Sequence, residues 1–253
     1  MPARLITIPF SHFCEKARWA LERAGIDHVE EPHLPVFHRR ALRRIRAGRT
    51  VPALVTAERE VVGDSTDILR WCDAHGRAAP LFPADQPGVD ELEDDFDRHL
   101  GPATRRVGYA ALLPSKAGFV ELIGRSGTPA WQRRSARLAR PLVVQLLKRG
   151  LGIDPAGVAR SRLVIDETFA RVGALLADGR PHLTGAPFTA ADLTFAALAA
   201  PVLVPDGYAA YLPATLPPTF LALRDQLRRT PAGAFGLRIY DRERNARPRP
   251  TAA

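Results

Sequence analysis

The sequence has few of the residues that build disulfide frameworks and structural metal centres. Only two of its 253 residues are cysteines, and its cysteines and histidines show no paired zinc-ligand spacing. No apolar run approaches the roughly 20 residues that cross a bilayer. The first residues lead straight into a strand, without the apolar core and cleavage site of a signal peptide. These absences favour a cytoplasmic protein with no metal site and no membrane span.

Lysine is also scarce, since it occurs only at positions 16, 116 and 148, so arginine supplies nearly all of the net charge of +9. The arginines are scattered and accompany no motif that reads nucleic acid. We therefore expect no nucleic-acid partner. We interpret most of these arginines as solvated surface, with a basic rim that attracts acidic ligands.

The first part of the chain alternates strands and helices. Short apolar runs predict strands at 4–8, 28–32, 50–55 and 60–62, and the segments between and after them predict helices at 12–24, 36–47 and 66–75. This order indicates that the first two strands are parallel and that the last two form a hairpin. Pro52 cannot donate a ladder hydrogen bond, so it belongs at the start or edge of its strand.

A different pattern follows residues 79–89, which contain three prolines and a glycine and are typical of a linker. We predict an α/β domain over 1–78 and an all-helical domain over 90–253. The expected helices of the second domain are 91–111, 129–150 with a kink at Pro141, 156–177, 190–202, 219–228 and 232–245. Thr189 and Asp192 fit a capping box at the start of a buried helix.

The turn Ser11-His12-Phe13-Cys14 joins the first strand to the first helix. It places a hydroxyl, three residues before a thiol, at a helix N-terminus, where unpaired N–H groups favour an anion such as a thiolate. The segment therefore predicts a thiol site. The reactive sulfur belongs either to Cys14 or to a bound ligand.

Several short motifs resemble the glutathione S-transferase superfamily in their order and spacing, across nearly the whole chain. They are Ser11-His12-Phe13-Cys14 with Arg18, Val51-Pro52-Ala53-Leu54, Asp64-Ser65 with Ile68, and Phe188-Thr189-Ala190-Ala191-Asp192-Leu193. The resemblance implies a thioredoxin-like N-terminal domain joined to an all-α C-terminal domain. It further implies a homodimeric detoxification enzyme that conjugates glutathione, its co-substrate, to an electrophilic small molecule.

By the same resemblance, Ser11 activates glutathione. Its hydroxyl would donate a hydrogen bond to the bound thiolate and lower the thiol pKa from about 8.5. The alternative is that Ser11 is only the helix N-cap. Phe10 and His12 flank it and are expected at the glutathione site, where His12 would either add positive charge or simply face solvent.

The other glutathione contacts are also implied by the resemblance. Pro52 would follow a cis peptide bond and expose the backbone of Val51 to the cysteinyl part of the tripeptide. Asp64 and Ser65 would hold the γ-glutamyl end, or else serve as an ordinary helix cap. Arg49, or another nearby arginine, would pair with the glycine carboxylate.

Cys14 leaves a second activity open. A dithiol pair needs two thiols, and Ser11 occupies the first position, which argues against dithiol exchange. Cys14 is then either a small core residue or a single redox thiol of a glutathione-dependent reductase. A non-catalytic ligand- or partner-binding module on the same fold is a third possibility. The electrophile pocket is expected between the domains, with the candidate residues Phe96, Leu100, Tyr109 and Trp131.

Overall fold

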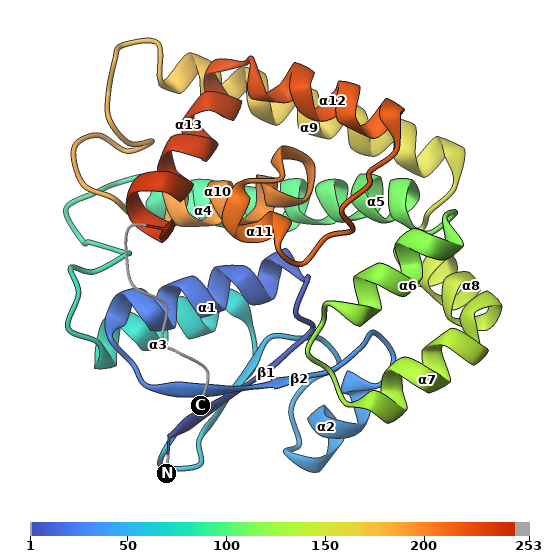
Figure 1. Ribbon diagram of the computed structural model, residues 1–253. Coiled ribbons are helices and arrows are strands. Elements are labelled where there is room, and N and C mark those ends of the chain that lie inside the picture. The colour runs from blue at the N-terminus through green and yellow to red at the C-terminus, as the bar shows by residue number, and fades with distance from the viewer. Residues whose placement is uncertain (1, 246–253) are drawn as a thin grey trace.

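Four short strands form one mixed sheet of order β2-β1-β3-β4 in the computed structural model, which describes residues 2–245 (Figure 1). The strands are β1 (Ala3–Thr7), β2 (His28–Pro32), β3 (Ala53–Val55) and β4 (Val61–Val62). β1 runs parallel to β2 and antiparallel to β3, with Leu5 opposite Glu30 on one side and Leu54 on the other. β3 and β4 are antiparallel. The predicted parallel pair and hairpin are therefore confirmed.

Helices cover both faces of this sheet. They are α1 (His12–Ala24), α2 (His38–Arg44) and α3 (Ser65–His75). Successive side chains of a strand point to opposite faces. Leu5 accordingly lies in the main hydrophobic core with residues of α1 and α3, whereas Ile6 packs with Ala41 and Leu42 of α2. The sheet with its three helices has the thioredoxin-like arrangement.

The rest of the described chain is helical. It comprises α4 (Val89–Asp95), the π-helical η1 (Phe96–Leu100), α5 (Gly101–Leu112), α6 (Lys116–Gly124), α7 (Ala130–Leu138), α8 (Arg140–Leu151), α9 (Pro155–Leu175), α10 (Ala190–Leu203), α11 (Asp206–Ala209), α12 (Pro218–Arg228), α13 (Pro231–Ile239) and the π-helical η2 (Tyr240–Asn245). The sequence did not predict α6 or α11. Two glycines weaken the helical signal of α6, and α11 has only four residues.

The expected kink at Pro141 is a complete break between α7 and α8. Pro141 lies in the first turn of α8, where its missing N–H has no intrahelical acceptor to lose. α7 and α8 project beside α2 (Figure 1), and the rings of Phe37 and Trp131 meet with their centroids 5.4 Å apart.

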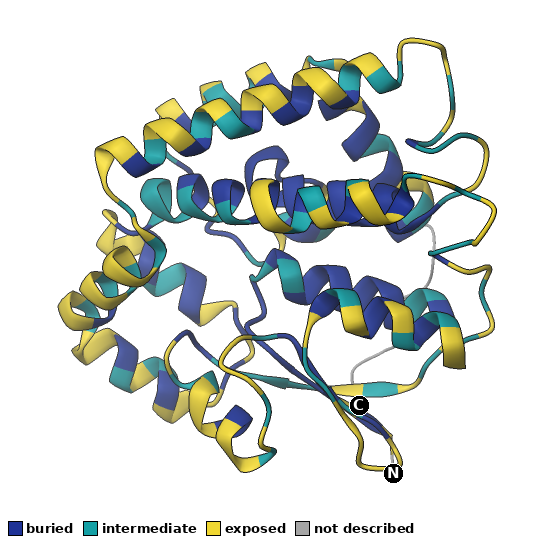
Figure 2. Cartoon of the chain, turned by 180° about the vertical axis from the view of Figure 1, so that it is seen from behind, coloured by how far each residue is buried: buried dark blue, intermediate teal, exposed yellow. Residues whose placement is uncertain are grey.

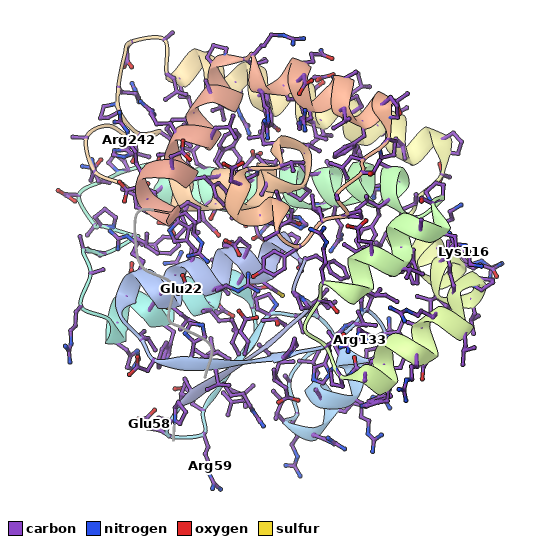
Figure 3. All side chains as sticks on the ribbon, in the orientation of Figure 1. Glu22, Glu58, Arg59, Lys116, Arg133 and Arg242 are labelled. Atoms are coloured by element: carbon purple, nitrogen blue, oxygen red, sulfur yellow. The ribbon has the colours of Figure 1, made fainter. Side chains whose placement is uncertain are left out.

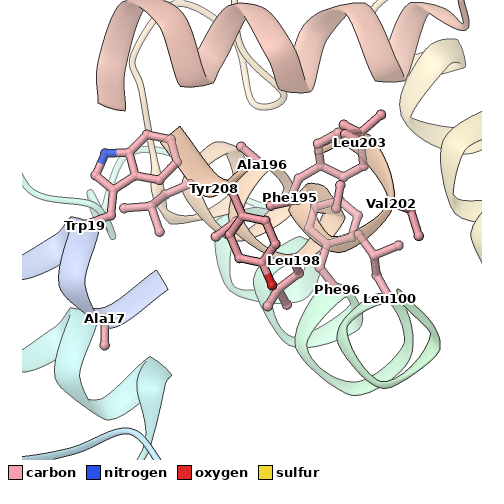
Figure 4. Packing of buried hydrophobic residues seen from close by; sticks show 14 of the residues in the cluster. Ala17, Trp19, Phe96, Leu100, Phe195, Ala196, Leu198, Val202, Leu203 and Tyr208 are labelled. Atoms are coloured by element: carbon pink, nitrogen blue, oxygen red, sulfur yellow. The ribbon is translucent and has the colours of Figure 1, made fainter. Parts of the chain in front are cut away.

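α10 forms the centre of the helical half, and all of its residues are buried (Figure 2). Its start is capped as predicted, because the backbone N–H of Thr189 donates to the Asp192 carboxylate at 2.8 Å. Figure 4 shows its side chains packed between Phe96 and Leu100 on one side and Trp19 of α1 on the other, and the rings of Phe96 and Phe195 lie 5.4 Å apart. The two halves of the chain thus share one continuous core.

The junction between the halves is close. A Cβ added to Gly101 at the start of α5 would lie 2.5 Å from the Phe13 ring, so a larger residue there would displace that ring. The residues between α3 and α4 contain no helix or strand, yet the Leu81 carbonyl accepts a hydrogen bond from the Ala190 N–H at 2.8 Å. The division into units of 1–78 and 90–253 with a linker at 79–89 stays a prediction.

Candidate functional site

A cleft of about 670 Å³ opens where the sheet half meets the helical half. Its walls come from the β1–α1 turn, the segment before β3, α5, α8 and the region from α11 to α12. Its volume lies within the range of about 300–1,000 Å³ that is usual for small-molecule sites. Phe10, Ser11, His12, Arg49 and Val51, all predicted from the sequence, line this cleft together.

Ser11 is the N-cap residue of α1, but its side chain makes no capping hydrogen bond. The first intrahelical bond uses its carbonyl, which accepts from the Glu15 N–H at 2.9 Å. The hydroxyl instead interacts with the Cys14 thiol and helps to lower its pKa. Ser11 thus lines the cleft, and its hydroxyl is not occupied in capping the helix.

Cys14 lies below this surface. Its side chain is fully buried, does not line the cleft, and receives the Ile8 N–H at 3.4 Å from nitrogen to sulfur. Burial raises the pKa of the Cys14 thiol to about 11, and the hydrogen bonds from Ile8 and Ser11 offset only part of that effect. A thiol in this environment is a poor nucleophile at neutral pH.

The segment before β3 forms a second wall. The Val51–Pro52 peptide bond is cis, as the resemblance implies. Pro52 precedes the first residue of β3 and so lies at the strand start, where its lack of an N–H is harmless. Arg49, Thr50 and Val51 line the cleft beside it.

The start of α3 carries the predicted pair Asp64 and Ser65. Asp64 is the N-cap residue, and its carboxylate accepts from the Thr66 N–H at 2.9 Å. Ser65 is buried, and its hydroxyl oxygen has no hydrogen-bond partner among the described residues. Neither residue lines the cleft itself.

The structure contradicts both expectations for His12, which were that it adds positive charge to the site or faces solvent. Only 2% of the residue is exposed, and its Nε2 donates to the Gly101 carbonyl at 2.9 Å across the junction of the halves. Burial, aided by Arg105 and Lys16, lowers the pKa of His12 to about 3. The residue is therefore neutral, adds no positive charge to the cleft, and does not face solvent.

Of the four predicted electrophile contacts, only Tyr109 lines the cleft. Phe96 and Leu100 are fully buried in the core. Trp131 is 53% exposed and borders a separate groove beside α2. The three wrong assignments share one cause, because spacing along a helix does not reveal which neighbour each face meets.

Several cleft residues were missed by the sequence analysis. The Tyr208 hydroxyl donates to the Phe10 carbonyl at 2.6 Å and so holds the turn that carries Ser11. Leu112, Leu147 and Leu212 supply part of an apolar wall. No local pattern marks these positions, since they approach the turn only through the packing of the helical half.

The charged lining of the cleft has one sign. Four arginines line it, namely Arg39, Arg49, Arg105 and Arg149, and none of its lining residues, all within residues 2–245, is an aspartate or glutamate. Such a site attracts anions.

Two further properties concern the described residues only. No helix among them is long and apolar enough to cross a membrane, and they hold no cluster of metal-ligating side chains.

Comparison with known proteins gives two kinds of likeness. The family model described as the glutathione S-transferase N-terminal domain matches residues 10–75. A search of curated proteins found no match. Among solved structures, a glutathione S-transferase of Ceriporiopsis subvermispora in complex with glutathione is 17% identical with a TM-score of 0.64, and covers 100% of both chains.

Two other solved structures have the same fold. A second glutathione S-transferase of Ceriporiopsis subvermispora, also in complex with glutathione, is 15% identical, covers 95% of this chain and 98% of that one, and has a TM-score of 0.63. A beta-etherase from Sphingobium sp. strain SYK-6 is 20% identical, with 94% and 99% covered and a TM-score of 0.57. Residues 10–75 therefore match the glutathione S-transferase N-terminal domain, and the chain as a whole has the fold of the glutathione S-transferases.

Proposed function

We propose that this protein is a glutathione transferase that binds glutathione in the cleft and joins its sulfur to an electrophilic small molecule. The observation that carries the proposal is the placement of Ser11, which lines the cleft at a helix N-terminus while its side chain makes no capping hydrogen bond. Glutathione-bound structures with the same fold support the choice of thiol. The homodimer stays a prediction.

Ser11 would act on the thiol that enters the cleft. Its hydroxyl would rotate from the Cys14 sulfur to donate a hydrogen bond to the glutathione thiolate, while the N-terminus of α1 adds favourable potential. The thiol proton leaves to solvent. The thiolate then forms a carbon–sulfur bond with the electrophile, which either releases a leaving group such as chloride to solvent or, in an addition, takes up a proton from water. Bringing the two reactants together in one cleft supplies much of the rate increase.

The remaining glutathione contacts follow from the chemistry of the tripeptide. The backbone of Val51 would pair with the cysteinyl unit, and Arg49 with the glycine carboxylate. Ser65 supports the assignment of the γ-glutamyl end to the start of α3, because its buried hydroxyl has no protein partner. Asp64 would accept the ammonium group of that end.

The alternative reductase would need Cys14 as its nucleophile. Full burial and a pKa raised to about 11 oppose this role, because the thiolate is the reactive form. The two activities make opposite predictions for two neighbouring residues, so they can be separated by experiment.

The test is the pKa of bound glutathione, followed by the ultraviolet absorbance of its thiolate. Loss of one hydrogen bond to a charged group costs about 1.5–3 kcal/mol, so Ser11→Ala should raise that pKa by one to two units. The conjugation rate at neutral pH with a generic chloronitrobenzene should fall about tenfold to a hundredfold. Cys14→Ala should leave both values close to those of the unaltered protein.

Three outcomes contradict the proposal. An unchanged pKa in Ser11→Ala removes Ser11 from the mechanism. Loss of activity in Cys14→Ala alone favours the reductase. Absence of glutathione binding by calorimetry, with retained binding of an apolar ligand, favours a non-catalytic binding module.

A further inference from the structure

The arginines of the cleft lie on two opposite walls. Arg39 and Arg49 belong to the sheet half, on the same side as Val51, where glutathione is expected. Arg105 lies on α5 and Arg149 on α8, both in the helical half. The proposed glutathione contacts use the first wall and leave the cations of the second wall without a role.

Arg105 is a half-buried cation without a partner anion. Its guanidinium carbon lies 5.7 Å from the centre of the Phe13 ring, and no carboxylate among residues 2–245 forms an ion pair with it. The acidic residue that acts on it, Asp97, is itself bound by Lys16 at 2.6 Å. Burial lowers the pKa of Arg105, and the neighbouring Tyr109 and Asp97 offset only part of that effect.

Arg106, the next residue of α5, is by contrast an arginine whose side chain has hydrogen-bond partners within the protein. Arg106 donates from Nε to the Leu151 carbonyl at 2.8 Å and hydrogen-bonds to the Ser161 hydroxyl. Arg149, in the last turn of α8, is exposed and its side chain has no such partner in the described part of the chain. Arg105 and Arg149 therefore both present free donors to the cleft.

The surface between these two arginines is apolar. Leu112, Leu147 and Leu151 line the cleft from the helices that carry Arg105 and Arg149. A ligand held here would bury an apolar body against leucines while an anionic end meets a guanidinium. Arginine suits that task, because its planar fork binds carboxylates and sulfonates through two hydrogen bonds.

The segments that border the cleft extend its positive field. Residues 32–57 contain six arginines and residues 122–153 contain six arginines and one lysine, and neither segment contains an aspartate or glutamate. They meet through Phe37 and Trp131, and Arg133 of α7 is labelled in Figure 3. This basic surface beside the cleft raises the local concentration of anions.

We propose that the second ligand of the cleft is an apolar organic acid, whose carboxylate or sulfonate binds Arg105 with Arg149 as an outer contact. If the proposed function holds, this ligand is the electrophile, and the transferase prefers anionic electrophiles. The binding preference itself does not depend on glutathione chemistry and can be measured without it.

The experiment uses two fluorescent probes that differ by one charged group, anilinonaphthalene sulfonate and its neutral parent phenylnaphthylamine. Their dissociation constants are measured with the full-length protein in the absence of glutathione. We expect the sulfonate to bind at least about tenfold tighter than the neutral probe, as for a charge-assisted pair. Arg105→Gln should lower this preference about tenfold, and Arg149→Gln about threefold, because an exposed pair contributes less.

Arg133→Gln is the matched control, since Arg133 belongs to the same basic surface but does not line the cleft. It should leave the preference unchanged. Equal affinities of the two probes for the unaltered protein overturn the proposal, whether or not any variant folds. An equal loss in Arg133→Gln and Arg105→Gln also overturns it, because the anion then binds the basic surface in general.

Glutathione binding separates this proposal from the proposed function. Arg105→Gln should leave the dissociation constant of glutathione unchanged, whereas Arg49→Gln should raise it. If Arg105→Gln weakens glutathione instead of the sulfonate probe, Arg105 belongs to the tripeptide site and the proposal fails. If glutathione does not bind at all but the probe preference is found, the proposed function fails and the acid-binding cleft stands.

Discussion

Two groups of arginines in this protein lie in opposite electrostatic surroundings. Arg18 of α1 and Arg244 of η2 are buried, and each meets two carboxylates. Arg105 and Arg149 lie on the helical wall of the cleft and meet none among the described residues. The same side chain therefore serves to hold the structure together in one place and is left free for a ligand in the other.

The buried group is a chain of ion pairs. Arg244 of η2 donates to Glu15 at 2.7 Å and also pairs with Glu22. Arg18 pairs with Glu15 and places Nη2 at 3.0 Å from Glu30, the β2 residue opposite Leu5. The last described helix is thus joined through α1 to the sheet.

The contrast indicates how the role of an arginine in this fold can be inferred from its partners. A buried ion costs several kcal/mol of desolvation unless good partners compensate it, so a cation kept partly buried without a partner is retained for another reason. In a cleft of suitable volume, binding of an external anion is such a reason. Three variants test this contrast, and the largest expected effect comes first.

Replacement of Arg244 by leucine should break the buried group. Glu22 then loses its arginine and Glu15 keeps only Arg18, so the free energy of unfolding should fall by about 3 kcal/mol or more. Urea denaturation followed by circular dichroism measures the change. Arg242→Leu is the control, because Arg242 lies exposed on the same π-helical segment (Figure 3) and should change stability by no more than about 0.5 kcal/mol. Equal losses in both variants would show that the ion pairs contribute little.

The second test concerns His12, which burial and the nearby cations Arg105 and Lys16 keep neutral. Its pKa in the folded protein is about 3, below its ordinary value of 6.5, so the unfolded chain takes up the proton first as the pH falls. Its contribution to stability is complete above pH 6.5 and is lost toward pH 3. At about pH 5 the loss should be about 2 kcal/mol.

His12→Gln isolates this contribution, because glutamine can still donate to the Gly101 carbonyl but does not titrate. The free energy of unfolding is measured by denaturant titration at pH 7 and pH 5 for both proteins. The unaltered protein should lose about 2 kcal/mol more than the variant between these values. If the free energy of unfolding falls equally in the two proteins, His12 takes up its proton as readily in the folded state as in the unfolded chain, and its pKa is not lowered.

The smallest effect is expected for Arg105→Gln. Since Arg105 is desolvated without an ion-pair partner, removal of its charge should leave the free energy of unfolding within about 0.5 kcal/mol, or raise it slightly. The measurement is the same urea titration as for Arg244→Leu. A loss comparable with that of Arg244→Leu would place Arg105 among the structural arginines and remove the contrast between the groups.

Much of the site near α1 could be predicted from the sequence. The β1–α1 turn is set by local residues, and the structure has α1 at 12–24 with Ser11 at its N-cap, as expected. The capped start of α10 was also identified, and these features depend on residues within a few positions of one another. The cis bond at Pro52 was implied by the family resemblance and is present.

The positions that were missed depend on contacts between distant segments. Glu15 and Arg244 lie 229 residues apart, and Tyr208 reaches the Phe10 carbonyl across 198 residues. The sequence treated His12 as a group near solvent because nothing local indicates that the start of α5 covers it. Trp131 was assigned to the cleft for the converse reason, since its helix packs beside α2 instead.

The sequence alone determined the order of strands and helices in the first 75 residues and the serine at the helix N-terminus, because short-range periodicity and turn chemistry encode them. Its short motifs carried the superfamily resemblance. Only the tertiary structure decided which charges are compensated. An arginine looks the same in every stretch of sequence, and its role follows from whether packing brings a carboxylate to it. At Arg244 it does, and at Arg105 packing leaves an open cleft instead.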